Sequence, residues 1–261
     1  MRRTTALWTT IAAATIATAT ALVTVSAAAP LAAPADDVIV IGEAILASPA
    51  TLTATTTATS TMAGCDDASY DLRGWRLGST YSWYYNGADA PASVAAGALA
   101  AITNGTKNVV AGVNRCGITA SLSMSQQYLG STTRAAQIGT DGSCTGNDGV
   151  SVSSWGTLPA GVLGVACAYY RSSSGTLTAS DMMLNKDMRW FIRKPIACSG
   201  MFDLKSVVVH ERGHTFGLGH VSQTTSAYQV MSPKTRACDI SKRKLNAGDL
   251  AGLTALYGAG A

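Results

Sequence analysis

Histidine and glutamate are scarce in this chain of 261 residues. It contains three histidines, and all three lie within the stretch from His210 to His220. Its only glutamates are Glu43 and Glu211, and the second lies inside the same stretch. A chain that places every histidine in one short segment does not use histidine as an ordinary core or surface residue. The composition therefore points to one dedicated site.

Other absences narrow the class of protein. No Cys-x-x-Cys pair is present, which argues against a zinc site built from cysteines. Outside residues 6–25 no apolar run is long enough to span a bilayer, and no cysteine follows that run closely enough for a lipid anchor. The formal net charge is only +4, so we expect no nucleic-acid partner. The basic run Lys242-Arg243-Lys244 is predicted to be a solvated loop.

The histidine-rich stretch reads His-Glu-x-x-His-x-x-Gly-x-x-His. Positions i and i+4 share one face of a helix, so His210 and His214 can bind the same ion. Glu211 lies about 100° further round the helix, beside the metal, where it can act as a general base. Gly217 permits the left-handed conformation that ends a helix, and the chain can then return His220 as a third ligand. Three imidazoles leave the fourth tetrahedral position for water, which is typical of a catalytic zinc site.

The N-terminal residues predict export. Arg2 and Arg3 precede a weakly apolar run over residues 6–25, and small residues follow up to Ala29. This order is typical of a cleaved signal peptide, which we place at residues 1–29; a membrane-spanning helix is the alternative. Residues 30–64 are rich in Ala, Thr, Ser and Pro, and we expect a linker or pro-segment that buries little apolar surface. Residues 65–261 suit one compact domain.

The predicted destination explains the cysteines. We expect a secreted, extracellular protein with no stable membrane association after signal cleavage. Six cysteines then remain, and an even number in a secreted chain predicts three disulfides whose pairing the sequence leaves open. Cys198 and Cys238 bracket the histidine motif, and we expect them to pair.

Periodicity predicts a mixed α/β (α+β) domain. Strands are expected over residues 81–85, 118–125, 161–170 and 177–184, and helices over 91–102, 203–216 and 246–257. The Gly/Ser/Asp-rich residues 141–155 are predicted to be a long surface loop.

These segments together resemble the metzincin metallopeptidases, and within them the matrixins, from about Trp75 to the end. Val230-Met231-Ser232-Pro233 is similar to the Met-turn, in which Met231 would form a hydrophobic floor under the zinc. Asp181–Asn185 with Trp190 resembles the strand and loop before the active-site helix, and Leu245–Gly258 resembles the C-terminal helix. The resemblance implies a zincin-like catalytic domain, with a twisted mixed sheet, an active-site helix and a C-terminal helix.

The resemblance also implies an activity. It is that of a zinc-dependent endopeptidase with one catalytic zinc, which hydrolyses internal peptide bonds of a protein or peptide substrate with Glu211 as general base. We expect a monomer. The extended substrate would bind along an edge strand, formed by Leu163, Gly164, Val165 and Ala166. Family calcium (Ca²⁺) sites would fall near four aspartates, with solvated loop acids as the alternative: Asp141, Asp148, Asp181 and Asp187.

The chain departs from the matrixin pattern in two respects. No histidine is left for the family's second, structural zinc. The pro-region has no cysteine to cap the catalytic zinc; Arg115-Cys116-Gly117 imitates that motif inside the domain, and we interpret Cys116 as a half-cystine. Latency through a cysteine is therefore in doubt. Two other classes stay open: another zinc hydrolase, such as an amidase or aminopeptidase, and a non-catalytic peptide-binding module.

Overall fold

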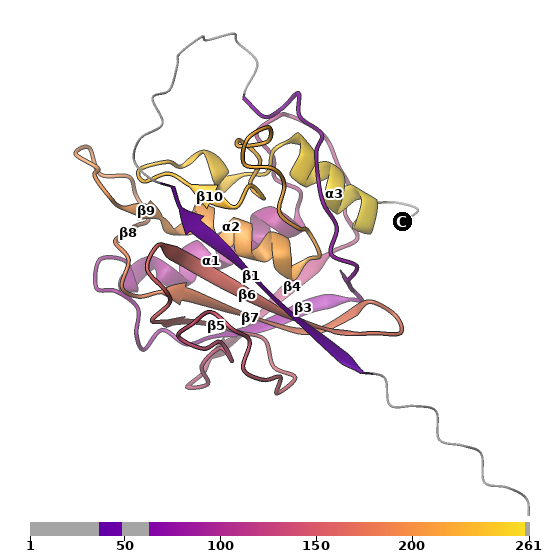
Figure 1. Ribbon diagram of the computed structural model, residues 1–261, viewed down its shortest axis with the longest axis horizontal. Helices are drawn as coiled ribbons and strands as arrows, with labels where there is room; N and C mark the ends of the chain where they lie inside the picture. The colour runs from indigo at the N-terminus through magenta and orange to yellow at the C-terminus, as the bar shows by residue number, and fades with distance from the viewer. Residues whose placement is uncertain (1–36, 49–62, 259–261) are drawn as a thin grey trace, which may run out of the picture. The chain divides into compact units, whose positions relative to one another are not determined.

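An eight-stranded mixed sheet runs through the computed structural model, which describes residues 37–48 and 63–258 (Figure 1). β6 is antiparallel to both of its neighbours, β1 and β7, whereas β7, β5, β3 and β4 pair in parallel. β2 (Arg76–Leu77) pairs with β7, and β8 (Trp190–Phe191) pairs separately with β9 (Phe202–Asp203). Across the sheet the order is β10 (Lys234–Thr235), β1 (Val38–Ala47), β6 (Val162–Arg171), β7 (Thr176–Asn185), β5 (Val152–Gly156), β3 (Thr80–Tyr85) and β4 (Ser125–Ser131).

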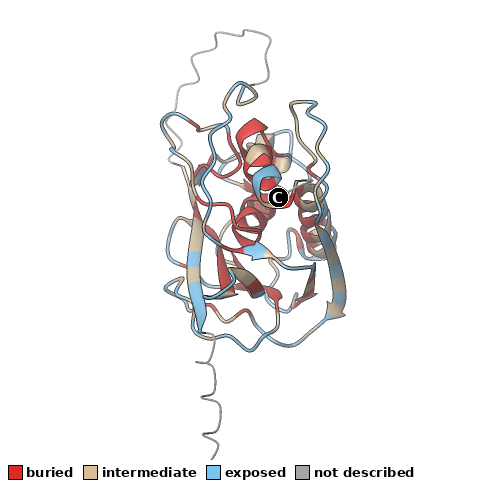
Figure 2. Ribbon diagram, turned by 90° about the vertical axis from the view of Figure 1, so that its right-hand side faces the viewer, coloured by how far each residue is buried: buried red, intermediate tan, exposed pale blue. Residues whose placement is uncertain are grey.

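Two helices pack against each other and against this sheet. α1 (Ala95–Val110) lies against α2 (Leu204–Thr215), and α2 crosses β6 and β1. The short helix η1 (Ser241–Arg243) and the C-terminal α3 (Ala247–Tyr257) follow α2 in the chain. Buried segments gather where the helices meet the sheet (Figure 2). The described residues contain no helix long and apolar enough to cross a membrane.

The helix α2 is buried on nearly all sides, and each end is fixed by a side chain. Asp203 caps its start, because its carboxylate accepts hydrogen bonds from Ser206 N (3.0 Å) and Ser206 Oγ (2.6 Å). Val207, Val208 and Val209 are fully buried, as expected for a helix that contacts both α1 and the sheet. At its end, the Trp75 indole N–H donates to the carbonyls of the last turn. Burial therefore stabilises this helix, although its β-branched residues have a low intrinsic helix propensity.

Most predicted strands and helices are confirmed, although the helix expected over residues 91–102 spans Ala95–Val110, and two elements are wrong. The strand expected over residues 118–125 begins only at Ser125; before it the chain makes a single bridge, between Leu122 and Gly258. The loop expected over residues 141–155 ends early, because β5 starts at Val152 and is buried. Its serines tolerate burial since they are bonded: Ser154 Oγ accepts from Ala136 N. Neither the missing strand nor the buried strand β5 can be read from the alternation of apolar residues or from the polarity of the sequence.

Part of the low-complexity region also departs from expectation. Within residues 30–64, which we expected to bury little apolar surface, Val38–Ala47 forms the ten-residue strand β1. It pairs with β6 along its whole length, and Ile45 is fully buried in the main core. The physical reason is local composition, because Val, Ile and Leu dominate this stretch while Ala and Thr dominate its flanks. The signal peptide predicted at residues 1–29 lies outside the described residues.

The three predicted disulfides are confirmed. They join Cys65 to Cys116, Cys144 to Cys167 and Cys198 to Cys238, so that the one pairing we expected is correct. Cys116 is thus a half-cystine, as its context predicted. Disulfides of this kind form and persist in oxidising compartments.

Candidate metal centre

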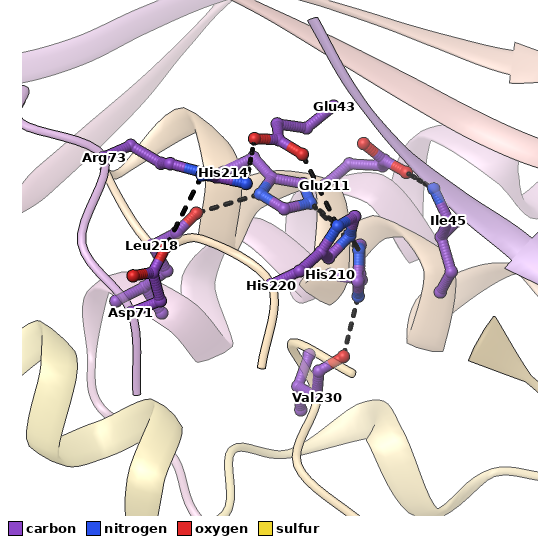
Figure 3. A network of polar contacts seen from close by, with 10 residues as sticks. All are labelled: Glu43, Ile45, Asp71, Arg73, His210, Glu211, His214, Leu218, His220 and Val230. Carbon is purple, nitrogen blue, oxygen red and sulfur yellow. Dashed lines mark hydrogen bonds and ion pairs between the residues drawn. The ribbon is translucent and has the colours of Figure 1, made fainter. Parts of the chain in front are cut away.

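The three histidines of the motif meet at one point (Figure 3). Nε2 of His210 lies 3.0 Å from Nε2 of His214, and Nε2 of His220 lies 3.1 Å from each of them. Imidazole nitrogens that bind zinc at 2.0–2.1 Å in tetrahedral geometry are roughly 3.3 Å apart. Gly217 has φ +91°, so the chain turns in the left-handed conformation that the motif predicted. The spacing therefore fits three ligands of a single zinc ion.

Hydrogen bonds to the outer ring nitrogens fix the tautomers. His210 Nδ1 lies 2.7 Å from the Val230 carbonyl oxygen, and His214 Nδ1 lies 2.9 Å from that of Leu218. A carbonyl can only accept, so each Nδ1 carries the proton and each Nε2 turns a lone pair to the centre. Lone pairs this close repel one another unless a cation lies between them. The donor set therefore fits a metal ion.

Burial also keeps the imidazoles in the neutral form that binds metal. It lowers the pKa of His210 and His214 well below the ordinary value, and the neighbouring histidines add to this effect. The pKa of His220, which is partly exposed, falls to about 4, first through burial and then through the charges of Arg73 and Lys242. Around neutral pH all three rings are ready to bind a metal.

Glu211 lies beside the triad without an ion-pair partner. It is fully buried; Oε1 accepts a hydrogen bond from Ile45 N (3.2 Å), and Oε2 has no partner. β6 approaches closely at Gly164, where an added Cβ would lie 3.1 Å from Oε1. Burial raises the pKa of Glu211 well above its ordinary value, the Ile45 hydrogen bond opposes this, and the Glu43 charge adds to it. Glu211 thus places a carboxyl group with one unpartnered oxygen next to the metal position.

The turn Val230–Pro233, predicted as the Met-turn, passes beside α2. Met231 is buried, and its sulfur lies where a side chain on Gly213 would be, so this approach requires glycine. The buried carboxylate of Asp249 in α3 braces the turn, since it accepts hydrogen bonds from Val230 N (2.8 Å) and Met231 N (3.0 Å). Val230 in turn supplies the carbonyl that orients His210. The brace on this turn therefore also positions a metal ligand.

The prediction that Lys242-Arg243-Lys244 is a solvated loop is wrong for Lys242 and Arg243, whereas Lys244 is exposed. Lys242 is buried, and its Nζ donates to the Ser232 carbonyl (3.0 Å), Ser232 Oγ (2.5 Å) and the Lys234 carbonyl (2.8 Å). Arg243 is ion-paired with Asp203 at 2.6 Å. Burial lowers the pKa of Lys242 to about 8. The carbonyls of a tight turn need donors, and a basic side chain from a neighbouring loop supplies them.

Sequence reasoning missed both Lys242 and Asp249, because these residue types are usually exposed. The one signal available was the start of α3, where Asn246 and Asp249 have the spacing of a capping box.

The four aspartates considered for calcium do not converge. Asp181 is buried and accepts from Gln137 N and Val152 N, both at 2.8 Å, and burial raises its pKa to about 6. Asp148 is paired with Arg134 at 2.8 Å, whereas Asp141 bonds to the nearby Ser143 and Asp187 is exposed. Among the described residues, the histidine triad is the one group of three side chains that could hold a metal.

The four residues predicted to bind substrate, Leu163–Ala166, lie on β6, where Gly164 approaches Glu211. The prediction that they form an edge strand is wrong, because β1 pairs along this side of β6. Ile45 pairs with Gly164, Ala44 with Val165 and Glu43 with Ala166. Figure 3 shows Glu43 reaching His220, and Ile45 reaching Glu211, from this strand. One Glu43 oxygen lies 2.5 Å from Arg73, and the other lies 3.5 Å from His220 Nδ1. A segment of the chain itself therefore covers the metal centre.

Comparison with known proteins finds similarity over the segment that holds this centre. The Matrixin family model matches residues 159–258. Metalloendoproteinase 4-MMP of Arabidopsis thaliana is 36% identical over 100 residues, which make up 38% of this chain and 26% of the relative. Metalloendoproteinase 1-MMP of the same plant is 34% identical over 101 residues, 38% of this chain and 25% of the relative. The matched segment thus spans about a quarter of the length of these curated relatives.

The similarity of this chain to one solved structure is weak. The one described as "Structure of a chaperone-substrate complex" covers 72% of this chain and 34% of its own, with 15% identity and a TM-score of 0.32. It supports no conclusion about fold or function.

Through residues 159–258, the chain is similar to the matrixin family of metallopeptidases. His210, His214 and His220 form its zinc site, on the predicted scaffold of a mixed sheet with an active-site helix.

Proposed function

We propose that this protein is a zinc-dependent endopeptidase that hydrolyses internal peptide bonds of proteins. The observation that carries the proposal is the position of Glu211. It is a buried carboxylate with one unpartnered oxygen, beside three convergent imidazoles and next to a strand edge that binds an extended chain. A binding module would need the strand edge but not the buried carboxylate.

The mechanism assigns one task to each group. When bound to the three histidines, zinc supplies a Lewis acid that acidifies water and polarises a carbonyl. Glu211 accepts the proton of the attacking water and passes it to the nitrogen of the leaving amine. The observed hydrogen bond from Ile45 N to Glu211 Oε1 shows that a backbone nitrogen can reach this carboxylate. Met231 and its turn hold His210 through the Val230 carbonyl.

Substrate binding is assigned to the edge of β6, at Leu163, Gly164, Val165 and Ala166. The pairing of β1 with these residues supports the assignment, because an extended strand already forms backbone hydrogen bonds with them. Backbone hydrogen bonds of this kind give affinity with little dependence on side chains. The glycine at position 164 leaves room for the chain to approach Glu211.

Further proposals follow from the N-terminal sequence. Residues 1–29 are proposed to be a signal peptide that directs the protein to the extracellular space, residues 30–64 a pro-segment, and residues 65–261 the catalytic domain. The three disulfides support an oxidising destination. We propose that the secreted protein acts as a monomer.

The test is product analysis by mass spectrometry. The purified full chain is incubated with a denatured protein and a peptide library, with and without a chelator. We expect chelator-sensitive cleavage at internal bonds. Release of single N-terminal residues would indicate an aminopeptidase, release of ammonia an amidase, and an absence of products a binding module. His214→Ala, which lacks a ligand, should lose both zinc and activity.

A further inference from the structure

We propose that β1 lies in the cleft as the enzyme's own bound substrate, that Ala44–Ile45 is the peptide bond presented for hydrolysis, and that its cleavage opens the active site. This inference rests on the proposed endopeptidase function. It assigns a processing site and a latency device to a pro-region that has no cysteine.

The first evidence is how β1 is held. On one side it pairs antiparallel with β6, from Val38 opposite Arg171 to Leu46 opposite Val162. On the other side it pairs in parallel with β10, where Leu46 N donates to the Pro233 carbonyl (2.9 Å). The strand thus lies between β6 and the turn Val230–Pro233. A substrate cannot use the same backbone groups of β6 while β1 is paired with them.

The second evidence is the position of one peptide bond. Glu43, on the N-terminal side, contacts His220, with 3.5 Å between Oε2 and Nδ1. Ile45, on the C-terminal side, donates its backbone N–H to Glu211 Oε1 at 3.2 Å. The bond from Ala44 to Ile45 therefore follows a residue whose side chain contacts a metal ligand, and its nitrogen contacts the general base. Its nitrogen is the atom that must receive a proton when the bond breaks, and it already lies within reach of Glu211 (Figure 3).

The third evidence is the burial of side chains along the strand. Ile45 is fully buried in the main core, whereas Val38, Ile39 and Val40 at the start of β1 are about two-fifths exposed. An isoleucine seated in an apolar pocket on the leaving side of the bond fixes the register of the strand. A slip by one residue would turn every side chain to the opposite face.

The proposed step balances with water as the only co-reactant. Water adds its oxygen to the carbonyl carbon of Ala44, and Glu211 takes its proton. The bond from that carbon to Ile45 N breaks, and the proton passes to this nitrogen. The products are a carboxylate at Ala44 and an amine at Ile45. Glu43 leaves with the N-terminal fragment, which removes its contacts with Arg73 and His220.

The experiment follows the full chain after purification with zinc. We expect a new N-terminus at Ile45 by mass spectrometry and N-terminal sequencing, with a rate constant independent of protein concentration because the bond lies in the same molecule. Hydrolysis of an added fluorogenic peptide should show a lag that ends as this cut is completed. The Glu211→Gln chain should stay uncut at Ala44–Ile45 with its zinc in place.

Two matched variants separate docking from folding. In Ile45→Asp a carboxylate replaces the buried isoleucine, so β1 should leave the cleft; the lag should disappear and the cut at this bond should be lost. In Ile39→Asp the same change is made at the exposed end of the strand, and both lag and cut should remain as in the parent. Should Ile45→Asp fail to fold, a synthetic peptide of residues 38–48 added to processed parent enzyme tests the same point, because it should be cut between Ala44 and Ile45.

Three results would overturn the proposal. One is an active enzyme whose Ala44–Ile45 bond stays intact. Another is cleavage only elsewhere in the N-terminal region. The third is a chain that hydrolyses added peptide without a lag while still uncut. A protein that hydrolyses neither itself nor any library peptide would instead contradict the proposed endopeptidase function.

Discussion

Replacing Glu211 with glutamine removes a proton acceptor and changes little else. The amide keeps the length of the side chain and an oxygen that can accept the hydrogen bond from Ile45 N. The glutamate has no ion-pair partner among the described residues, so neutralising it breaks no salt bridge. We therefore expect zinc content and thermal unfolding to match those of the parent.

The expected loss of rate is large, because no other group can take over. Glu43, the only other glutamate, is bound to Arg73 at 2.5 Å and belongs to the strand that covers the cleft. Removal of a general base lowers the rate by about 10²–10⁴-fold. At 1.36 kcal/mol for each factor of ten, this corresponds to about 3–5 kcal/mol of transition-state stabilisation.

The assay must compare chains whose clefts are equally accessible. We would measure kcat/KM for a fluorogenic peptide with Ile45→Asp and with the double variant Ile45→Asp/Glu211→Gln, and zinc content by elemental analysis. His214→Ala is the control for loss of metal. A comparison of the parent with the single variant Glu211→Gln, both of which keep Ile45, reports self-cleavage at Ala44–Ile45.

One result would refute the reasoning about Glu211. If the double variant held a full complement of zinc and cleaved the peptide within a few-fold of the Ile45→Asp rate, Glu211 would not be the general base.

Four further predictions follow from the structure. Asp249→Asn leaves N–H groups of the Met231 turn unsatisfied, so it should cost about 1–3 kcal/mol and lower the unfolding temperature by several degrees; an unchanged temperature contradicts the brace. Elemental analysis should find one zinc per chain, since the described residues offer one triad, and two tightly bound zinc ions would refute this. Burial lowers the pKa of His220 to about 4, so this ligand should stay neutral and zinc should be retained as pH falls through 6.5, the ordinary imidazole value; dialysis at stepped pH measures this. Thiol titration of the unfolded, non-reduced chain should find no free cysteine, and two free thiols would contradict the three disulfides.

The zinc centre could be predicted almost completely from the sequence. His210, His214 and His220 are separated by spacings that a helix and a glycine turn convert directly into coordination geometry. Such local rules leave the tertiary structure few alternatives. The strands β6 and β7 and the helices α2 and α3 were predictable from the sequence as well, because β6, β7 and α3 are largely apolar segments of suitable length and α2 carries the histidine motif.

The supports of the centre could not be predicted in this way. Asp249 and Lys242 are of residue types that a single sequence assigns to the surface. They are buried because the backbone of the Met231 turn offers N–H and C=O groups that need partners. The serines of β5 made it look like a loop for a similar reason, since their partners lie far away in the chain.

The sequence by itself determined the chemistry of this protein: a three-histidine metal site, an adjacent carboxylate, and six cysteines suited to an oxidising compartment. Only the tertiary structure decided which segment lies over that chemistry. β1 reaches the metal centre through pairing with β6, more than a hundred positions further along the chain. Strand pairing depends on backbone groups common to every residue, so the sequence of either strand alone does not identify its partner.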